Sequence, residues 1–115
     1  MIHICICDDS DAMRDELCGL IQGLCQKHSI AASVSCCSSG EELLFDPDDK
    51  NRTTDIFFLD ILMKKLNGIE TAAKLRAINP TAQIIFLTVS KEGQYPNAYF
   101  NEVASRDSTT AFSIK

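Results

Sequence analysis

The sequence predicts an α/β fold built on an open parallel sheet with helices on both faces. Two observations lead to this fold class. Short apolar runs typical of buried strands alternate with segments whose apolar residues recur every three or four positions. The 115 residues, 45% of them hydrophobic, suffice for one soluble domain with a single core.

The first strand and helix are predicted from a change of periodicity. Residues 2–7 form an apolar run that ends abruptly at Asp8, as expected for a strand buried on both faces. From Asp11 to about His28 the apolar residues follow the spacing of an amphipathic helix, whose N-cap is Ser10 or Asp11.

A second strand and a shorter helix are expected next. Residues 31–37 have strand character, and Ser39 with Glu42 three positions later forms a capping box, which marks a helix start. The segment 46–54 is wholly polar and is expected to be a solvated surface loop.

The later elements follow the same alternation. Residues 55–60 read as an apolar strand with a carboxylate at each end, residues 69–78 as a helix that Asn79 and Pro80 end, and residues 83–88 as a fourth strand. In the tail we expect two short elements, a helix over 98–104 and a strand over 111–114.

Charge and composition exclude several classes of function. Eleven basic against sixteen acidic residues give a net charge of −5, which provides no basic surface for direct nucleic-acid binding. The sequence contains neither an apolar stretch of roughly 20 residues nor a basic signal-peptide start, so we expect a cytoplasmic protein. The six cysteines are then expected to be reduced thiols.

Four polar residues lie at the carboxyl ends of predicted strands. Asp8 and Asp9 follow the first strand, Asp60 ends the third and Thr88 ends the fourth. Because these ends share one edge of a parallel sheet, we expect the side chains to converge. Three close carboxylates repel one another unless a hard cation neutralises them, which favours Mg²⁺. A carboxylate beside such an ion can attack phosphorus, with Thr88 as a hydroxyl donor.

Four segments of the sequence together carry a family likeness: Ile6-Cys7-Asp8-Asp9-Ser10, Phe58-Leu59-Asp60-Ile61, Asn67-Gly68-Ile69-Glu70-Thr71-Ala72 and Ile84-Ile85-Phe86-Leu87-Thr88. They resemble the receiver domains of two-component response regulators, and the likeness covers roughly residues 2–90. The latter segments are most similar to receivers that carry LytTR-type DNA-binding outputs.

The resemblance implies a flavodoxin-like, doubly wound sheet of order 2-1-3-4-5 and a signalling domain that is not an enzyme, spanning residues 1–115. Asp60 would accept a phosphoryl group from a sensor histidine kinase in a Mg²⁺-dependent reaction. Asp9 and Asp60 would bind Mg²⁺ directly, Asp8 mainly through water, and Leu62 through its backbone carbonyl.

The C-terminal part departs from the family pattern. Phe112 and Lys115 keep the three-residue spacing of an aromatic switch residue and a phosphate-binding lysine, so Lys115 is the candidate for that lysine; Lys91 or Arg106 could also reach the site. The final helix of the family is missing, as in an atypical or truncated chain. The sheet flank that this leaves uncovered predicts homodimerisation or exchange of terminal segments.

Two other functions stay open at this point. A receiver-like interaction module that does not use phosphorylation would suit the irregular tail. A Mg²⁺-dependent phosphohydrolase with an Asp nucleophile would need a second acid two positions later, where Leu62 stands. DNA binding is expected only through an output domain outside this chain.

Overall fold

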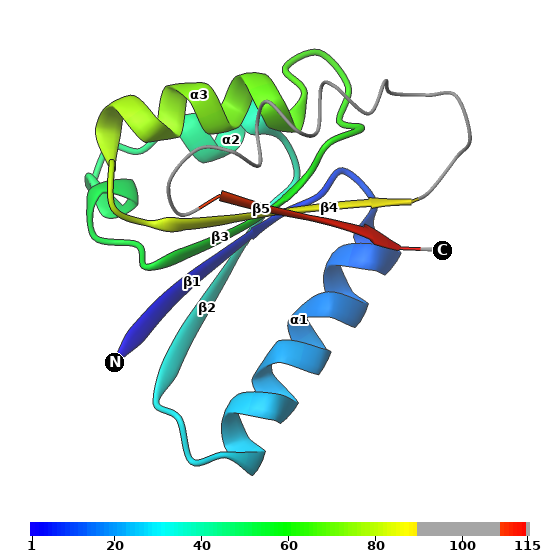
Figure 1. Ribbon diagram of the computed structural model, residues 1–115, viewed down its shortest axis with the longest axis vertical. Coiled ribbons are helices and arrows are strands. Elements are labelled where there is room, and N and C mark those ends of the chain that lie inside the picture. The colour runs from blue at the N-terminus through cyan, green and yellow to red at the C-terminus, as the bar shows by residue number, and fades with distance from the viewer. Residues whose placement is uncertain (90–108, 115) are drawn as a thin grey trace.

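The fold is a five-stranded parallel sheet with helices on both faces (Figure 1). The computed structural model describes residues 1–89 and 109–114, and for Thr88, Val89 and the segment 109–114 it describes the backbone alone. The elements are β1 Ile2–Cys7, α1 Asp11–Lys27, β2 Ala32–Cys37, α2 Gly40–Leu44, the 3₁₀ turn η1 Lys50–Arg52, β3 Ile56–Asp60, α3 Gly68–Ile78, β4 Gln83–Val89 and β5 Thr109–Ile114.

The strand order is β2-β1-β3-β4-β5, which confirms the predicted order. The chain moves from β1 outward to β2 and then crosses back to β3 on the other side of β1. The direction of winding therefore reverses between β1 and β3. In open sheets of this kind, the crevice at the carboxyl ends of such a strand pair is where ligands bind.

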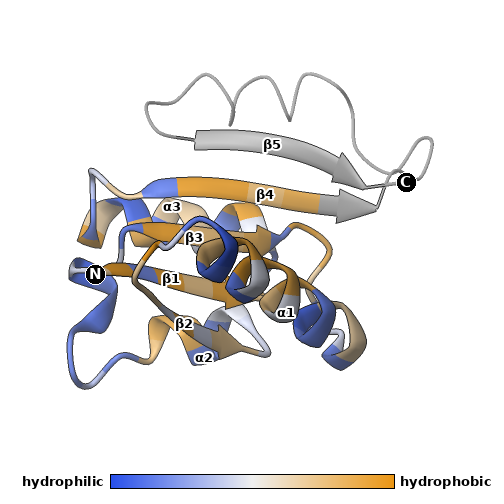
Figure 2. Cartoon of the chain, turned by 90° about the horizontal axis from the view of Figure 1, so that it is seen from below, coloured by the Kyte–Doolittle hydropathy of each residue, from blue (hydrophilic) through white to orange (hydrophobic). Residues whose placement is uncertain are grey.

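The two faces of the sheet carry separate cores because successive strand residues point to opposite sides. On β1, Ile4 and Ile6 pack with Ile21 beneath α1, whereas Cys5 and Cys7 join the larger core beneath α2 and α3. Burial on both faces explains why β3 and β4 are hydrophobic along most of their length (Figure 2). The largest fully buried side chains of the second core are Phe57, Phe86, Leu59, Ile61 and Leu75.

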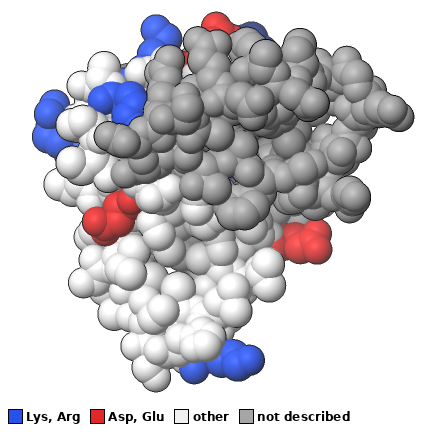
Figure 3. All heavy atoms as spheres, viewed as in Figure 1, with Lys and Arg blue, Asp and Glu red and all other residues white. Residues whose placement is uncertain are grey.

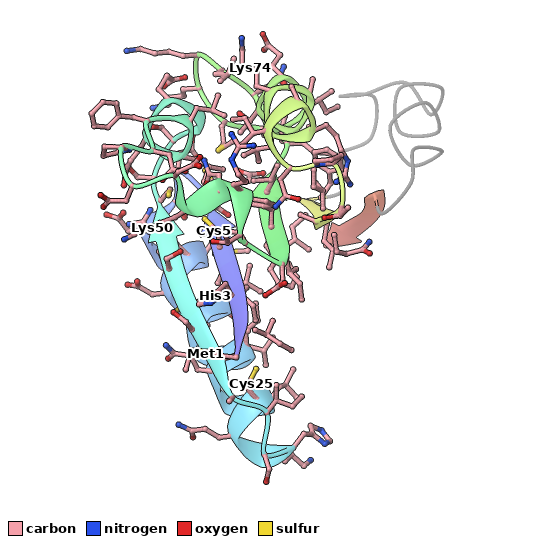
Figure 4. The ribbon with its side chains drawn as sticks, turned by 90° about the vertical axis from the view of Figure 1, so that its left-hand side faces the viewer. Met1, His3, Cys5, Cys25, Lys50 and Lys74 are labelled. Atoms are coloured by element: carbon pink, nitrogen blue, oxygen red, sulfur yellow. The ribbon has the colours of Figure 1, made fainter. Side chains whose placement is uncertain are left out.

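The six cysteines are free; five of them lie in or against the two cores, and Cys36 is exposed. Figure 4 shows Cys5 on β1 and Cys25 on α1. The sulfur atoms of Cys5 and Cys37 lie 4.0 Å apart, within the core under α2 and α3. Thiols in such buried positions act as small apolar side chains, which explains how the cores accommodate the other five without a disulfide.

The tail contributes one described element. Strand β5 contains the predicted strand at residues 111–114 and begins two residues earlier, at Thr109. It runs parallel to β4, with Phe112 opposite Leu87. The helix expected over 98–104 lies outside the described residues.

The segment 46–54 is not a wholly solvated loop, contrary to the sequence prediction. Asn51 and Thr54 are only 5% and 9% exposed. The Asn51 side-chain amide donates to the carbonyl of Leu43 at 2.8 Å, and the Asn79 amide donates to the carbonyls of Asn51 and Thr54, both at 2.8 Å. The polar composition could not reveal this burial, because the partner comes from the end of α3.

Replacement of this partner should destabilise the whole domain. In Asn79→Ala, two buried carbonyls lose their donor and the backbone amide of Ala82, 3.0 Å from Asn79 Oδ1, loses its acceptor. We expect the free energy of unfolding to fall by about 2–4 kcal/mol, measured by urea denaturation. The control Gln22→Ala, on the exposed side of α1, should stay within about 0.5 kcal/mol of the wild type. Equal urea midpoints for the two variants would contradict this assignment.

Candidate acidic site at the strand ends

Three carboxylates meet at the carboxyl ends of β1 and β3. Asp8 and Asp9 follow β1 directly, and Asp60 is the last residue of β3. One oxygen from each of the three side chains lies within 4.8 Å of the others. The structure thus brings together residues that are 52 positions apart in the chain, because β1 and β3 are hydrogen-bonded neighbours.

The loop after β1 is held by the same residue that starts α1. The backbone N–H of Ser10 donates to Asp8 Oδ1 at 2.8 Å, while the Ser10 hydroxyl accepts from the backbone N–H of Met13 at 3.3 Å as the helix N-cap. From the next turn of α1, Arg14 Nη1 donates to the backbone carbonyl of Asp8 at 2.9 Å. The Asp8 carboxylate and carbonyl are therefore both fixed by the start of the helix.

The loop after β3 folds back onto the carboxylate that precedes it. The N–H of Leu62 donates to Asp60 Oδ1 at 3.1 Å, and the N–H of Gly68 donates to the carbonyl of Ile61 at 3.1 Å. A Cβ atom at position 68 would lie 2.3 Å from the backbone oxygen of Asp60. Only glycine allows this approach, which places the first turn of α3 directly against the end of β3.

Two contacts join these loops to each other and to α2. The N–H of Lys64 lies 3.4 Å from Asp9 Oδ2, and Glu41 of α2 accepts from the N–H of Leu66 at 2.9 Å. Neither Glu41 nor Arg14 was predicted from the sequence as a site residue. Neither residue belongs to a motif, and each acquires its role only when the tertiary fold brings its partner close.

Burial and mutual repulsion shape the electrostatics of the site. Loss of hydration together with the charge of Asp8 raises the pKa of Asp60 to about 6, and the hydrogen bond from Leu62 opposes that shift. The pKa of Asp8 is also raised, mainly by burial, against the opposing hydrogen bond from Ser10 and the charge of Arg14. Ionisation of Asp8 and Asp60 together is therefore costly without a cation between them.

The donor set fits a hard divalent cation. All three groups offer carboxylate oxygens, which Mg²⁺ and Ca²⁺ prefer over nitrogen or sulfur. Asp9 is exposed while Asp8 and Asp60 are largely covered, so an ion at this position would be anchored from the protein side and open to solvent on the other. An open side leaves room for water or for an oxygen of a ligand.

The other site residues predicted from the sequence are Thr88, Leu62 and Lys115. Thr88 directly follows Leu87, which is the β4 partner of Asp60, so its backbone lies at the same edge of the sheet. The N–H of Leu62 donates to the Asp60 carboxylate. Metal binding by the backbone carbonyl of Leu62 stays a prediction. Lys115 and the alternatives Lys91 and Arg106 lie outside the described residues.

Comparison with known proteins gives one consistent family. A family model described as the response regulator receiver domain matches residues 4–106. The sensory transduction protein LytT of Oceanobacillus iheyensis is 39% identical over 75 residues, which cover 65% of this chain and 28% of that protein. This chain spans roughly a third of the length of the curated relatives that it matches.

Solved structures show the same fold. A response regulator receiver domain protein from Clostridium thermocellum matches with a TM-score of 0.80 at 18% identity, covering 98% of this chain and 82% of that chain. The response regulator protein TrrA from Thermotoga maritima, solved in complex with Mg²⁺-BeF, matches with a TM-score of 0.75 at 23% identity, covering 100% of this chain and 88% of that chain.

The close approach at position 68 gives a direct test of the local geometry. In Gly68→Ala the added methyl group meets backbone, which cannot rotate away, so we expect a loss of about 2–3 kcal/mol in the free energy of unfolding. The matched control is Gly23→Ala in α1, where an added Cβ meets nothing within 4 Å. That variant should gain about 0.5–1 kcal/mol from helix propensity. A Gly68→Ala protein as stable as Gly23→Ala would refute the packing described here.

The raised pKa of Asp60 predicts a pH dependence of stability. The folded pKa of about 6 lies above the ordinary value of 3.8, so the folded state favours the protonated form. The stabilisation from Asp60 is complete below about pH 4 and is lost as the pH rises through about 6. In EDTA, Asp60→Asn should therefore be more stable than the wild type at neutral pH, by about 1–2 kcal/mol after allowance for solvent screening.

This difference should vanish near pH 4, as urea denaturation at the two pH values would show. The control Asp15→Asn, on the exposed surface of α1, should follow the wild type throughout. A wild type that is as stable as Asp60→Asn at neutral pH without divalent cations would show that burial and repulsion do not oppose the ionisation of Asp60.

Proposed function

Since this chain belongs to the response regulator receiver domain family, we propose that Asp60 is its phosphoacceptor and that Asp8, Asp9 and Asp60 together hold the Mg²⁺ that the reaction needs. The observation that carries the proposal is the meeting of the three carboxylates within 4.8 Å at the ends of β1 and β3. Phosphoryl transfer requires positioning and charge neutralisation more than elaborate acid–base chemistry, which suits so small a site.

The different surroundings of the three carboxylates support their different roles. Asp60 ends a strand, and its Oδ1 is fixed by the N–H of Leu62, which orients the carboxylate for attack. Asp8 is 9% exposed and is held by Ser10, so it is poorly placed to meet a donor. Asp9 is exposed at the rim of the site. We assign Asp60 as the nucleophile, Asp9 as a direct metal ligand and Asp8 as a ligand mainly through water.

The transfer step follows from this arrangement. A carboxylate oxygen of Asp60 attacks the phosphorus atom of a phosphohistidine, and the phosphorus–nitrogen bond breaks as the electron pair leaves with the imidazole. The product is an acyl phosphate on Asp60. Bound Mg²⁺ supplies the positive charge that offsets the three carboxylates and the phosphoryl oxygens. With a pKa of about 6, Asp60 is mostly ionised at neutral pH and can act as the nucleophile.

Three further residues complete the proposed site. Thr88 would donate its hydroxyl to the phosphoryl group, which its backbone position beside the β4 partner of Asp60 supports. Leu62 would offer its backbone carbonyl to the metal. Lys115 would bind the phosphoryl group, a role supported by its spacing from Phe112, which β5 places opposite Leu87.

The partners of the domain are proposed from the same family relationship. A sensor histidine kinase would be the phosphoryl donor, and the complex of TrrA with Mg²⁺-BeF supports Mg²⁺ as the ion. On the face seen in Figure 3, charged side chains of the described residues stand singly or in small groups without a broad basic surface. Together with the net charge of −5, this supports contact with DNA through an output domain and not through this domain. Homodimerisation and a cytoplasmic location stay predictions.

The described part of the chain offers no support for the two alternatives raised by the sequence. A phosphohydrolase would need an acid two residues after Asp60, and Leu62 occupies that position with its N–H on the carboxylate. An interaction module without phosphorylation would not need three carboxylates held together against their repulsion. No helix among the described residues is long and apolar enough to cross a bilayer.

Chemical phosphorylation tests the proposal directly. Incubated with acetyl phosphate and Mg²⁺, the wild type should gain the mass of one phosphoryl group in intact-mass spectrometry, and EDTA should abolish the gain. Asp60→Ala should remain unmodified because the nucleophile is gone. Asp15→Ala, which removes an exposed carboxylate of α1, should be labelled like the wild type. Labelling of Asp60→Ala to the same extent as Asp15→Ala would overturn the assignment.

A further inference from the structure

Arg14 reaches from α1 back to the end of β1 and touches two acidic residues in different ways. Its Nη1 donates to the backbone carbonyl of Asp8 at 2.9 Å, and its Nη2 pairs with the carboxylate of Asp11. The Arg14 side chain is 17% exposed, whereas that of Asp11 is 85% exposed. The guanidinium thus lies against the loop while its acidic partner faces solvent.

The carbonyl contact bears on the orientation of Asp9. A peptide unit is planar, so the carbonyl of Asp8 and the N–H and Cα of Asp9 move together. The Asp8 side chain is held from the other side by the N–H of Ser10. Asp9 is exposed, and the N–H of Lys64 approaches its Oδ2 only to 3.4 Å. The direction in which Asp9 leaves the chain is consequently set by the peptide that Arg14 holds.

Arg52 forms an ordinary exposed ion pair and serves as a comparison for Arg14. Arg52 also pairs with an aspartate three positions earlier, Asp49, at 2.9 Å. There both side chains are about 60% exposed, at 62% and 60%, and the pair lies on the solvated side of the η1 turn. Exposed pairs of this type contribute little to stability. Arg14 differs because Nη1 of its guanidinium donates to a backbone carbonyl of the acidic loop while Nη2 pairs with Asp11.

We propose that Arg14 is a positioning residue of the metal-binding loop, which holds the peptide between Asp8 and Asp9 so that both carboxylates face Asp60. The inference rests on the proposed function of the acidic site. Arg14 does not touch the metal, and it acts through the backbone of its ligands. Groups that orient metal ligands in this way are typically worth 10–100-fold in metal affinity.

Magnesium titration of matched variants tests this role. We compare the wild type with Arg14→Ala and Arg52→Ala, following backbone amide shifts by NMR as Mg²⁺ is added. The Kd for Mg²⁺ should rise roughly 10-fold in Arg14→Ala and stay at the wild-type value in Arg52→Ala. Arg14→Lys, which keeps the charge but not the fork, should recover part of the loss. Asp11→Asn removes the charged partner of Arg14 Nη2, so its Kd for Mg²⁺ should lie between those of the wild type and Arg14→Ala.

The rate of acetyl phosphate labelling supplies a second readout. In Arg14→Ala the Mg²⁺ concentration for half-maximal labelling should rise by the same factor, while the maximal rate at saturating Mg²⁺ stays near that of the wild type. A general loss of folding would lower the maximal rate instead. Should Arg14→Ala fail to fold, the order of Kd values among wild type, Asp11→Asn and Arg14→Lys decides the question.

The possible failures are distinguishable. Equal Kd values for the wild type and Arg14→Ala, or equal losses in Arg14→Ala and Arg52→Ala, would overturn the role of Arg14 and leave the magnesium site intact. A wild type whose amides near Asp8 and Asp60 do not respond to Mg²⁺ would overturn both the site and the role of Arg14.

Discussion

Repulsion between carboxylates is the constraint on which the organisation of this domain depends. Asp8, Asp9 and Asp60 are held together although burial and like charge oppose the ionisation of Asp8 and Asp60. Such a cluster persists only if the surrounding backbone is fixed more firmly than repulsion can displace it. The parallel pairing of β1 with β3 brings the acids together, and the loops after both strands hold them there.

The first turns of two helices hold much of the acidic site in place. The Ser10 hydroxyl caps α1, and the Ser10 backbone N–H donates to the Asp8 carboxylate. Arg14 of the same helix donates to the Asp8 carbonyl. On the other side, α3 begins at Gly68 directly against the backbone of Asp60. A change at the acidic site would therefore first displace the starts of α1 and α3, which cover opposite faces of the sheet (Figure 1). These contacts give a route by which a change of charge at the acidic site would reach the helix ends.

Much of the fold could be predicted from the sequence because its signals are local. A strand that is buried on both faces is apolar along most of its length, so the runs at 2–7, 55–60 and 83–88 were recognisable without a partner. The placement of Asp8, Asp9 and Asp60 at strand ends was likewise predictable, since parallel strands end at one edge. Thr88 was predicted in the same way, from its place at the end of the fourth strand. The roles of Leu62 and Lys115 rest on resemblance, because nothing in their local sequence specifies a ligand.

The sequence by itself determined the order of elements and the acids that would meet. Only the tertiary structure decided the rest: that the Asn79 amide binds the carbonyl of the buried Asn51, that Arg14 turns back to the Asp8 carbonyl, and that position 68 has no room for a side chain. The physical reason is the same in each case. Hydropathy patterns report which way a residue faces, whereas a buried hydrogen bond or a close backbone approach depends on atoms from another segment, which no local pattern encodes.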